Sequence, residues 1–162
     1  MSIIKKREKA PIEIEDAINA RLTGDARKNL LDWAASMREN GFSFIGFTSG
    51  NGGGSIAYKG KSIGCMDIAQ VYEKEHVDFV LWLFLDCEFD SDGADDELKE
   101  FAWAHVPICR QEKYCKKYCN LSRNRWQIFE REFESVCHAP LAFWNPDAND
   151  FENIKKLLLR LK

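Results

Sequence analysis

The stretch Asp78-Phe-Val-Leu-Trp-Leu-Phe-Leu-Asp86 places seven consecutive apolar residues between two aspartates. A continuous apolar run of this length, rich in aromatic residues, is typical of a central strand that is covered on both faces. Side chains alternate along a strand, which predicts one face with Phe79, Leu81, Leu83 and Leu85 and another with Val80, Trp82 and Phe84. We expect helices to cover the first face, and a loop, a ligand or a partner to cover the second.

The segments on either side of this stretch predict the rest of the sheet. Residues 42–48, 56–59 and 62–69 have strand-like composition, and the glycine-rich residues 49–55 are typical of a turn. Residues 141–144 form a last predicted strand before a turn at Asn145-Pro146. Together these segments predict an antiparallel sheet of four to five strands.

Apolar residues at helical spacing predict helices near both ends of the chain. A short helix is expected over residues 11–22, and a second is expected from a cap at Asp25 to a stop at Asn40-Gly41. A helix from about Asp92 toward Pro107 should follow the central strand. A final helix should begin after a cap at Asp147 or Asn149. Its predicted apolar stripe is Phe151, Ile154, Leu157, Leu158 and Leu161.

The segment from Trp126 to Cys137 is ambiguous between two kinds of structure. Its apolar residues recur at helical spacing, which favours a helix, whereas its aromatic content is also compatible with a strand. We expect a helix here and leave the strand as the alternative.

Length and composition indicate a single α+β domain. The chain has 162 residues, of which 45% are hydrophobic, enough for one sizeable core. We expect a basic flexible tail over residues 1–10 and one two-layer domain over residues 11–162, with an N-terminal helix pair and a C-terminal helix on the sheet.

Charge and hydropathy narrow the functional classes. The net charge of −3 does not favour nucleic-acid binding by the molecule as a whole. The basic tail is not followed by an apolar core of the kind found in signal peptides, and the longest apolar run is too short to span a bilayer. A cytoplasmic protein that makes no use of a membrane is therefore expected.

Four of the six cysteines fall in or just after a basic loop predicted near residues 105–125. Cys109, Cys115, Cys119 and Cys137 offer enough thiolates for a closed tetrahedral zinc site. The spacing lacks the paired short knuckles of zinc ribbons, so the same thiols could instead be buried bystanders. A third possibility is a thiol-dependent enzyme in which Cys115 or Cys119 is the nucleophile or part of a redox pair.

The second face of the central strand is the other candidate site. Trp82 and Phe84 should lie on it, and Tyr58 on a neighbouring strand is the third candidate for an aromatic pocket that binds a small organic ligand. A homodimer that buries the same face is the alternative. Our main hypothesis is a non-enzymatic binding or regulatory domain, with a zinc-stabilised protein-interaction module and a thiol-dependent enzyme as alternatives.

The chain resembles an uncharacterised family of small bacterial α+β proteins in three motifs near its C-terminus. These are Ile128-Phe-Glu-Arg-Glu-Phe-Glu-Ser-Val-Cys137, Phe143-Trp-Asn-Pro-Asp147 and Ile154-Lys-Lys-Leu-Leu158. The family is distantly similar to the YdhG-like and GyrI-like domains, some of which bind small molecules in an aromatic-lined concavity. The resemblance implies a bacterial, cytoplasmic α+β domain and carries over no catalytic residue.

Overall fold

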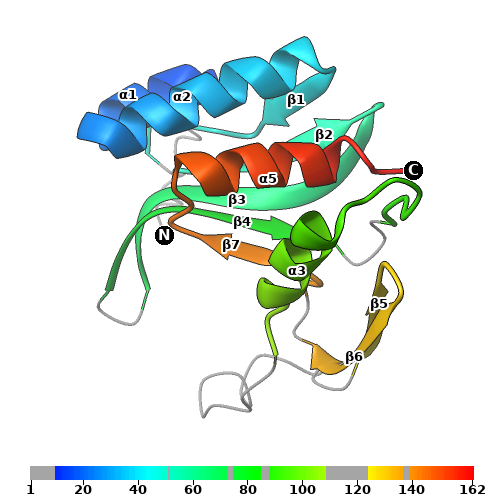
Figure 1. Cartoon of the computed structure of the whole chain (residues 1–162). Helices are drawn as coiled ribbons and strands as arrows, with labels where there is room; N and C mark the ends of the chain where they lie inside the picture. Colours follow the sequence, from blue (N-terminus) through cyan, green and yellow to red (C-terminus); the bar gives the residue numbers. More distant parts are fainter. Residues whose placement is uncertain (1–9, 51, 73–74, 85–87, 109–123, 137–138) are drawn as a thin grey trace, which may run out of the picture.

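In a computed structural model of the chain, the long apolar stretch forms most of β4 (Glu75–Leu83) within a five-stranded antiparallel sheet. The structure describes residues 10–50, 52–72, 75–84, 88–108, 124–136 and 139–162. The strand order is β1-β2-β3-β4-β7, with β1 (Phe42–Ile45), β2 (Gly53–Tyr58), β3 (Lys61–Tyr72) and β7 (Ala142–Trp144). The first four strands are a meander, and the last returns beside β4 (Figure 1). The predicted antiparallel sheet is confirmed.

Three helices cover one face of this sheet. They are α1 (Ile14–Arg21), α2 (Gly24–Glu39) and α5 (Ala148–Leu158), and Figure 1 shows them in a layer above the strands. A further helix, α3 (Asp96–Ala104), lies beside the C-terminal half of α5. The predicted two-layer α+β fold, with an N-terminal helix pair and a C-terminal helix, is therefore confirmed.

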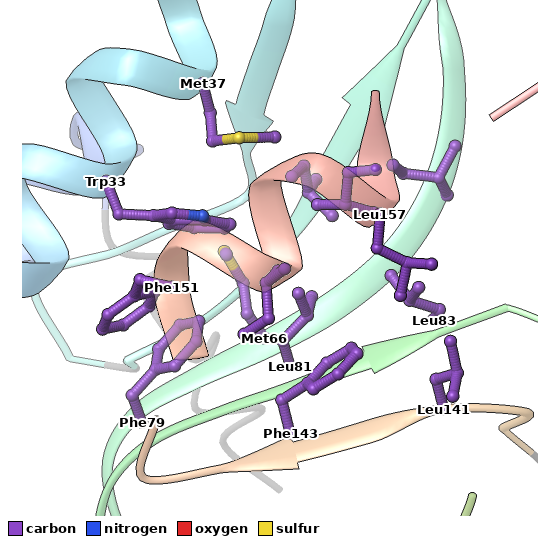
Figure 2. Close-up of a cluster of buried hydrophobic side chains, with 14 of the residues drawn as sticks. Trp33, Met37, Met66, Phe79, Leu81, Leu83, Leu141, Phe143, Phe151 and Leu157 are labelled. Atoms are coloured by element: carbon purple, nitrogen blue, oxygen red, sulfur yellow. The ribbon is translucent and has the colours of Figure 1, made fainter. Parts of the chain in front are cut away.

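The core lies between the helices and the sheet, as Figure 2 shows. Trp33 of α2 is at its centre, with ring centroids 5.9 Å from Phe44, 5.9 Å from Phe79 and 5.4 Å from Phe151. Phe79, Leu81 and Leu83 all point into this layer and are buried. The predicted inward face of the central strand is thus confirmed for these three residues, whereas Leu85 lies outside the described residues.

Side-chain caps explain where two of the helices begin. Asp147 and Asp150 form a reciprocal capping box at the start of α5, and Asp95 accepts a 2.8 Å hydrogen bond from the Leu98 amide at the start of α3. The cap predicted at Asp147 is confirmed. The cap predicted at Asp25 is wrong: Thr23 precedes α2, so Asp25 lies in the first turn, where its charge favours the helix dipole.

The segment predicted as a helix after Trp126 is a β-hairpin. It consists of β5 (Asn124–Ile128) and β6 (Arg131–Val136), which form a separate two-stranded sheet. Trp126 pairs directly with Phe133 across this hairpin. Residues seven apart lie two turns apart on one side of a helix, and a two-residue hairpin turn also brings such residues face to face, so the spacing does not separate the two structures. The strand alternative is the correct one.

The glycine-rich segment also differs from its prediction. It was predicted to be a turn over residues 49–55, but β2 begins at Gly53 and includes Gly54. A Cβ built on Gly54 would lie 2.3 Å from the Phe47 ring, so glycine here allows a close packing contact as well as a turn.

Among the described helices, none is both long and apolar enough to cross a membrane.

Candidate functional site

The sheet face turned away from α1, α2 and α5, here called the outer face, is defined by the strand registers. Because Phe79, Leu81 and Leu83 point toward the helices, Val80 and Trp82 point the other way. The residues opposite them on the neighbouring strands share this outer face. The paired outer-face positions are Ser43, Ile45, Gly53, Ser55, Ala57, Cys65, Asp67, Val80, Trp82, Ala142 and Trp144.

A pair of tryptophans stands on this face. The rings of Trp82 and Trp144 are 5.5 Å apart and nearly perpendicular, at 89°. Trp144 is 47% exposed, and Val80, directly opposite it on β4, is fully buried. Phe84 follows the end of β4 and is 37% exposed. Single exposed apolar residues are ordinary on protein surfaces, but several on one face are typical of a binding surface.

Polar groups on the outer face are acidic or neutral. Asp67 lies opposite Val80, and alternation along β4 places Asp78 on the same side as Val80. Asp78 Oδ1 accepts a 2.9 Å hydrogen bond from Nε2 of His76, two residues before it on the same strand. No Lys or Arg occupies any of the outer-face positions described above. Among these described positions the acidic residues are therefore Asp67 and Asp78, and Asp78 is paired with His76.

A thiol lies between the aromatic and acidic parts of the outer face. Cys65 is opposite Trp82 and two residues before Asp67. Burial raises the pKa of the Cys65 thiol, and the negative charge of Asp67 raises it further. The thiolate is disfavoured, so Cys65 is a poor nucleophile at neutral pH.

Asn145 holds the end of β7 against β4. Its side-chain Oδ1 accepts hydrogen bonds from the backbone amides of Asp78, at 2.8 Å, and Phe79, at 3.3 Å. Its own amide donates to the Phe79 carbonyl at 2.8 Å. Asn145 has a φ of +45°, a conformation that Asn tolerates better than most residues. These three hydrogen bonds fix the position of Trp144, the residue just before.

The structure brings together only part of the predicted aromatic site. Trp82 and Phe84 are both near the end of β4, but Tyr58 is on the opposite side of the sheet. Tyr58 pairs with the core residue Phe42 and stacks on its ring at 4.3 Å. Trp144, which was not among the predicted residues, takes the place beside Trp82. Alternation within residues 141–144 was the available signal, because an inward Phe143 requires an outward Trp144.

A further cavity lined by described residues is remote from the outer face. It measures about 550 Å³ and lies between the start of α3 and the end of α5. Arg160 lines it, and its guanidinium donates to the carbonyls of Asp92, at 2.8 Å, and Gly93, at 2.6 Å. The Arg160 guanidinium of this cavity therefore already holds the loop before α3.

The predicted zinc ligands Cys109, Cys115, Cys119 and Cys137 lie outside the described residues. Within the described part of the chain, no three His, Cys, Asp or Glu side chains are arranged to hold a metal ion. The described neighbours of the cysteines do converge: Ile108 forms a bridge with Val136, and Asn124 pairs with the same residue. The residues next to Cys109 and Cys137 are thus close to one another.

Comparison with known proteins adds no further constraint. The chain matches no family model, no curated protein and no solved structure. The similarity to the YdhG-like and GyrI-like domains stays a prediction. The function has to be argued from the outer face itself.

Proposed function

We propose that this protein is a non-enzymatic, cytoplasmic binding domain that holds a small organic ligand against its outer face. The observation that carries this proposal is the perpendicular Trp82–Trp144 pair, in which Trp144 leaves nearly half of its surface in water. Covering such a surface with an apolar ligand is favourable by about 25 cal/mol per Å² of apolar area removed from water. Aromatic residues such as tryptophan also often contribute the largest share of the free energy of binding at an interface.

The chemistry of the described side chains supports binding rather than catalysis. The Cys65 thiol has a raised pKa, so it does not meet the requirement for an activated nucleophile. His105 is near Ala142 but its Nδ1 hydrogen-bonds the Phe101 carbonyl at 2.7 Å, and its ring packs on Phe143. These contacts indicate that His105 has a structural role and not a catalytic one.

Charge favours a ligand over a homodimer on this face. In a symmetric dimer the same patch of both subunits meets, so the carboxylates of Asp67 and Asp78 from both subunits would share one interface as it loses water. Like charges brought together in a poorly solvated interface are costly unless compensated. A small ligand can cover the two tryptophans without bringing a second set of carboxylates.

The proposal can be tested with N-phenyl-1-naphthylamine, a neutral apolar probe that fluoresces when it leaves water. We expect the full chain to bind it, and Trp144→Ala to weaken that binding about fivefold, a loss of about 1 kcal/mol. Leu159→Ala is the matched control, since Leu159 is 42% exposed but belongs to the helical layer. Equal affinities for all three proteins would count against the outer face as the binding site.

The same samples test the homodimer. Size-exclusion chromatography should give a monomer near 18.7 kDa. A species of twice this mass that Trp82→Asp converts to a monomer would instead assign the outer face to self-association.

A second candidate function is a zinc-stabilised protein-interaction module built on Cys109, Cys115, Cys119 and Cys137. The observation favouring it is the position of their described neighbours, because Ile108 and Asn124 both pair with Val136. Metal binding at such a site would contribute directly to folding. Protein purified without chelators should then contain one zinc per chain and melt at a lower temperature after chelation. Unchanged melting would exclude a structural metal.

A further inference from the structure

A small basic cavity lies on the helical side of the sheet, next to Tyr58. It measures about 170 Å³ and is formed by the turn between β2 and β3 together with the chain that follows α5. Its lining includes Tyr58, Lys59, Lys61, Glu88 and Lys162. Pockets that enclose a drug-sized molecule measure about 300–1,000 Å³, so this cavity suits a small ion or the charged end of a larger molecule.

The side chains of this cavity are mostly basic, although the chain as a whole carries a net charge of −3. Three lysines line it, and Glu88 is the one acidic residue in its lining. Glu88 forms no ion pair with any residue that the structure describes, and neither Lys59 nor Lys162 pairs with a carboxylate among those residues. An anion that enters the cavity therefore does not have to displace a carboxylate from these two ammonium groups.

Lys59 has a backbone conformation that is unfavourable for lysine. Its φ is +50° and that of Gly60 is +78°, and the two residues form a hairpin turn closed by the pair of Tyr58 and Lys61. Both central positions of such a turn require a positive φ, which is why Asn-Gly is the favoured sequence there. Lysine in place of asparagine thus costs turn stability, and this cost favours a functional reason for the charge.

Contacts on both sides of the cavity hold Lys59 and the backbone of Lys162 in place. The Lys59 Nζ lies 4.8 Å from the centre of the Tyr58 ring, and that ring stacks on Phe42 at 4.3 Å. On the other side, the Lys162 amide donates a 3.2 Å hydrogen bond to the Glu88 carbonyl. Groups that are positioned before binding lose less conformational entropy when a ligand arrives.

We propose that this cavity binds a phosphate group, free or carried by a small molecule, among the ammonium groups of Lys59, Lys61 and Lys162. Lysine is a common phosphate ligand because its ammonium group is a compact charge with several donors. A phosphate has more acceptor oxygens than a carboxylate, so it suits a site lined by several ammonium groups. The Tyr58 hydroxyl is a further donor for such a group.

This cavity and the outer face are on opposite sides of the sheet. The inference therefore goes beyond the proposed function and can be tested independently of it. It also gives Tyr58 a role in ligand binding, at a different site from the one predicted for it beside Trp82.

The test is a titration of the ¹⁵N-labelled full chain with inorganic phosphate at constant ionic strength, balanced with sodium chloride. We expect saturable shifts of the backbone amide signals of Lys59, Gly60 and Lys61. Glycerol 1-phosphate is titrated in the same way. Tighter binding of this ester than of inorganic phosphate would identify a phosphorylated small molecule as the ligand, and weaker binding would identify the free ion.

Two substitutions remove ammonium groups while preserving the fold. Lys59→Asn places the favoured residue in the turn, so it should keep or raise the melting temperature and weaken phosphate binding about two- to fivefold. Lys162→Gln should weaken binding by a similar factor. Lys28→Gln is the matched control and should leave binding unchanged, because Lys28 is exposed on α2 and pairs with Asp32 at 3.3 Å.

Three results would overturn this inference. The first is the absence of a saturable shift with either phosphate compound. The second is phosphate binding by the Lys59→Asn and Lys162→Gln proteins that is as tight as that of the parent. The third is equal weakening by all three substitutions, which would show that binding depends only on the overall charge. If Lys59→Asn lowers the melting temperature, the comparison of Lys162→Gln with Lys28→Gln decides.

Discussion

Truncation of two adjacent residues on β7 should destabilise the protein by very different amounts, because the two side chains lie on opposite faces of the sheet. Phe143 is fully buried and stacks on Phe101, with ring centroids 5.7 Å apart and planes at 11°. Removing a buried aromatic ring costs about 3–5 kcal/mol, so Phe143→Ala should lose that much stability. Trp144 is 47% exposed, so about half of the same penalty applies and no closed cavity forms. We expect Trp144→Ala to cost about 1.5–2.5 kcal/mol.

The assay is urea unfolding followed by far-ultraviolet circular dichroism, which does not depend on the tryptophan being removed. A domain of this kind has about 5–15 kcal/mol of stability in total, so the two variants should have clearly different midpoints. Phe143→Leu is included because it keeps most of the buried volume if Phe143→Ala fails to fold. It should bind N-phenyl-1-naphthylamine as tightly as the parent does, whereas Trp144→Ala should bind it about fivefold more weakly.

Two results would refute the reasoning. If Trp144→Ala destabilises the protein as much as Phe143→Ala, the outer face is part of the core and not a binding surface. If Phe143→Leu weakens binding of the probe as much as Trp144→Ala does, binding depends on the integrity of β7 and not on the exposed ring.

Three further predictions concern a cap, an ion pair and a thiol. Asp147→Ala should lower the free energy of unfolding by about 1 kcal/mol because the α5 cap is lost, and an unchanged urea midpoint would contradict that role. Burial raises the pKa of the Glu15 carboxyl, but its hydrogen bond to Arg38, a backbone hydrogen bond and the charge of Arg38 outweigh burial and leave that pKa below its ordinary value. Ionised Glu15 then stabilises the folded state above about pH 4, and this contribution is lost as the pH falls through the lowered pKa. Glu15→Gln should therefore flatten the acid side of a stability profile measured by urea unfolding, and an unaltered profile would refute this. At about pH 7.5, Cys65 should react with iodoacetamide more slowly than a free cysteine, as followed by peptide mass spectrometry, and Asp67→Asn should speed the reaction; no change in rate would show that the charge of Asp67 does not reach the thiol.

The parts of the fold that sequence predicted correctly depend on local patterns. The run through Phe79, Leu81 and Leu83 predicted a central strand, and alternation predicted which of its side chains face the helices. Asp147 was recognisable as a cap because it precedes an apolar stripe at helical spacing. In these cases the residues that decide the structure are within a few positions of each other, so sequence spacing is also spatial spacing.

The candidate site was only partly predictable from the sequence, because its residues are far apart in the chain. Tyr58 was expected beside Trp82, but the register between β2 and β3 shifts between Ile56 and Ala57, and Tyr58 pairs with a core residue of β1. Trp144 is 62 residues beyond Trp82 in the chain, and no pattern along the sequence states that β7 returns beside β4.

The sequence by itself determined the α+β class, the inward face of the central strand and the start of the last helix, because binary patterning and capping are local properties of the chain. Only the tertiary structure decided that Trp126 belongs to a hairpin, that Tyr58 faces away from Trp82 and that Trp144 joins it. Those outcomes depend on strand register and on which distant strands pair, and a shift of one residue in register moves a side chain to the other face.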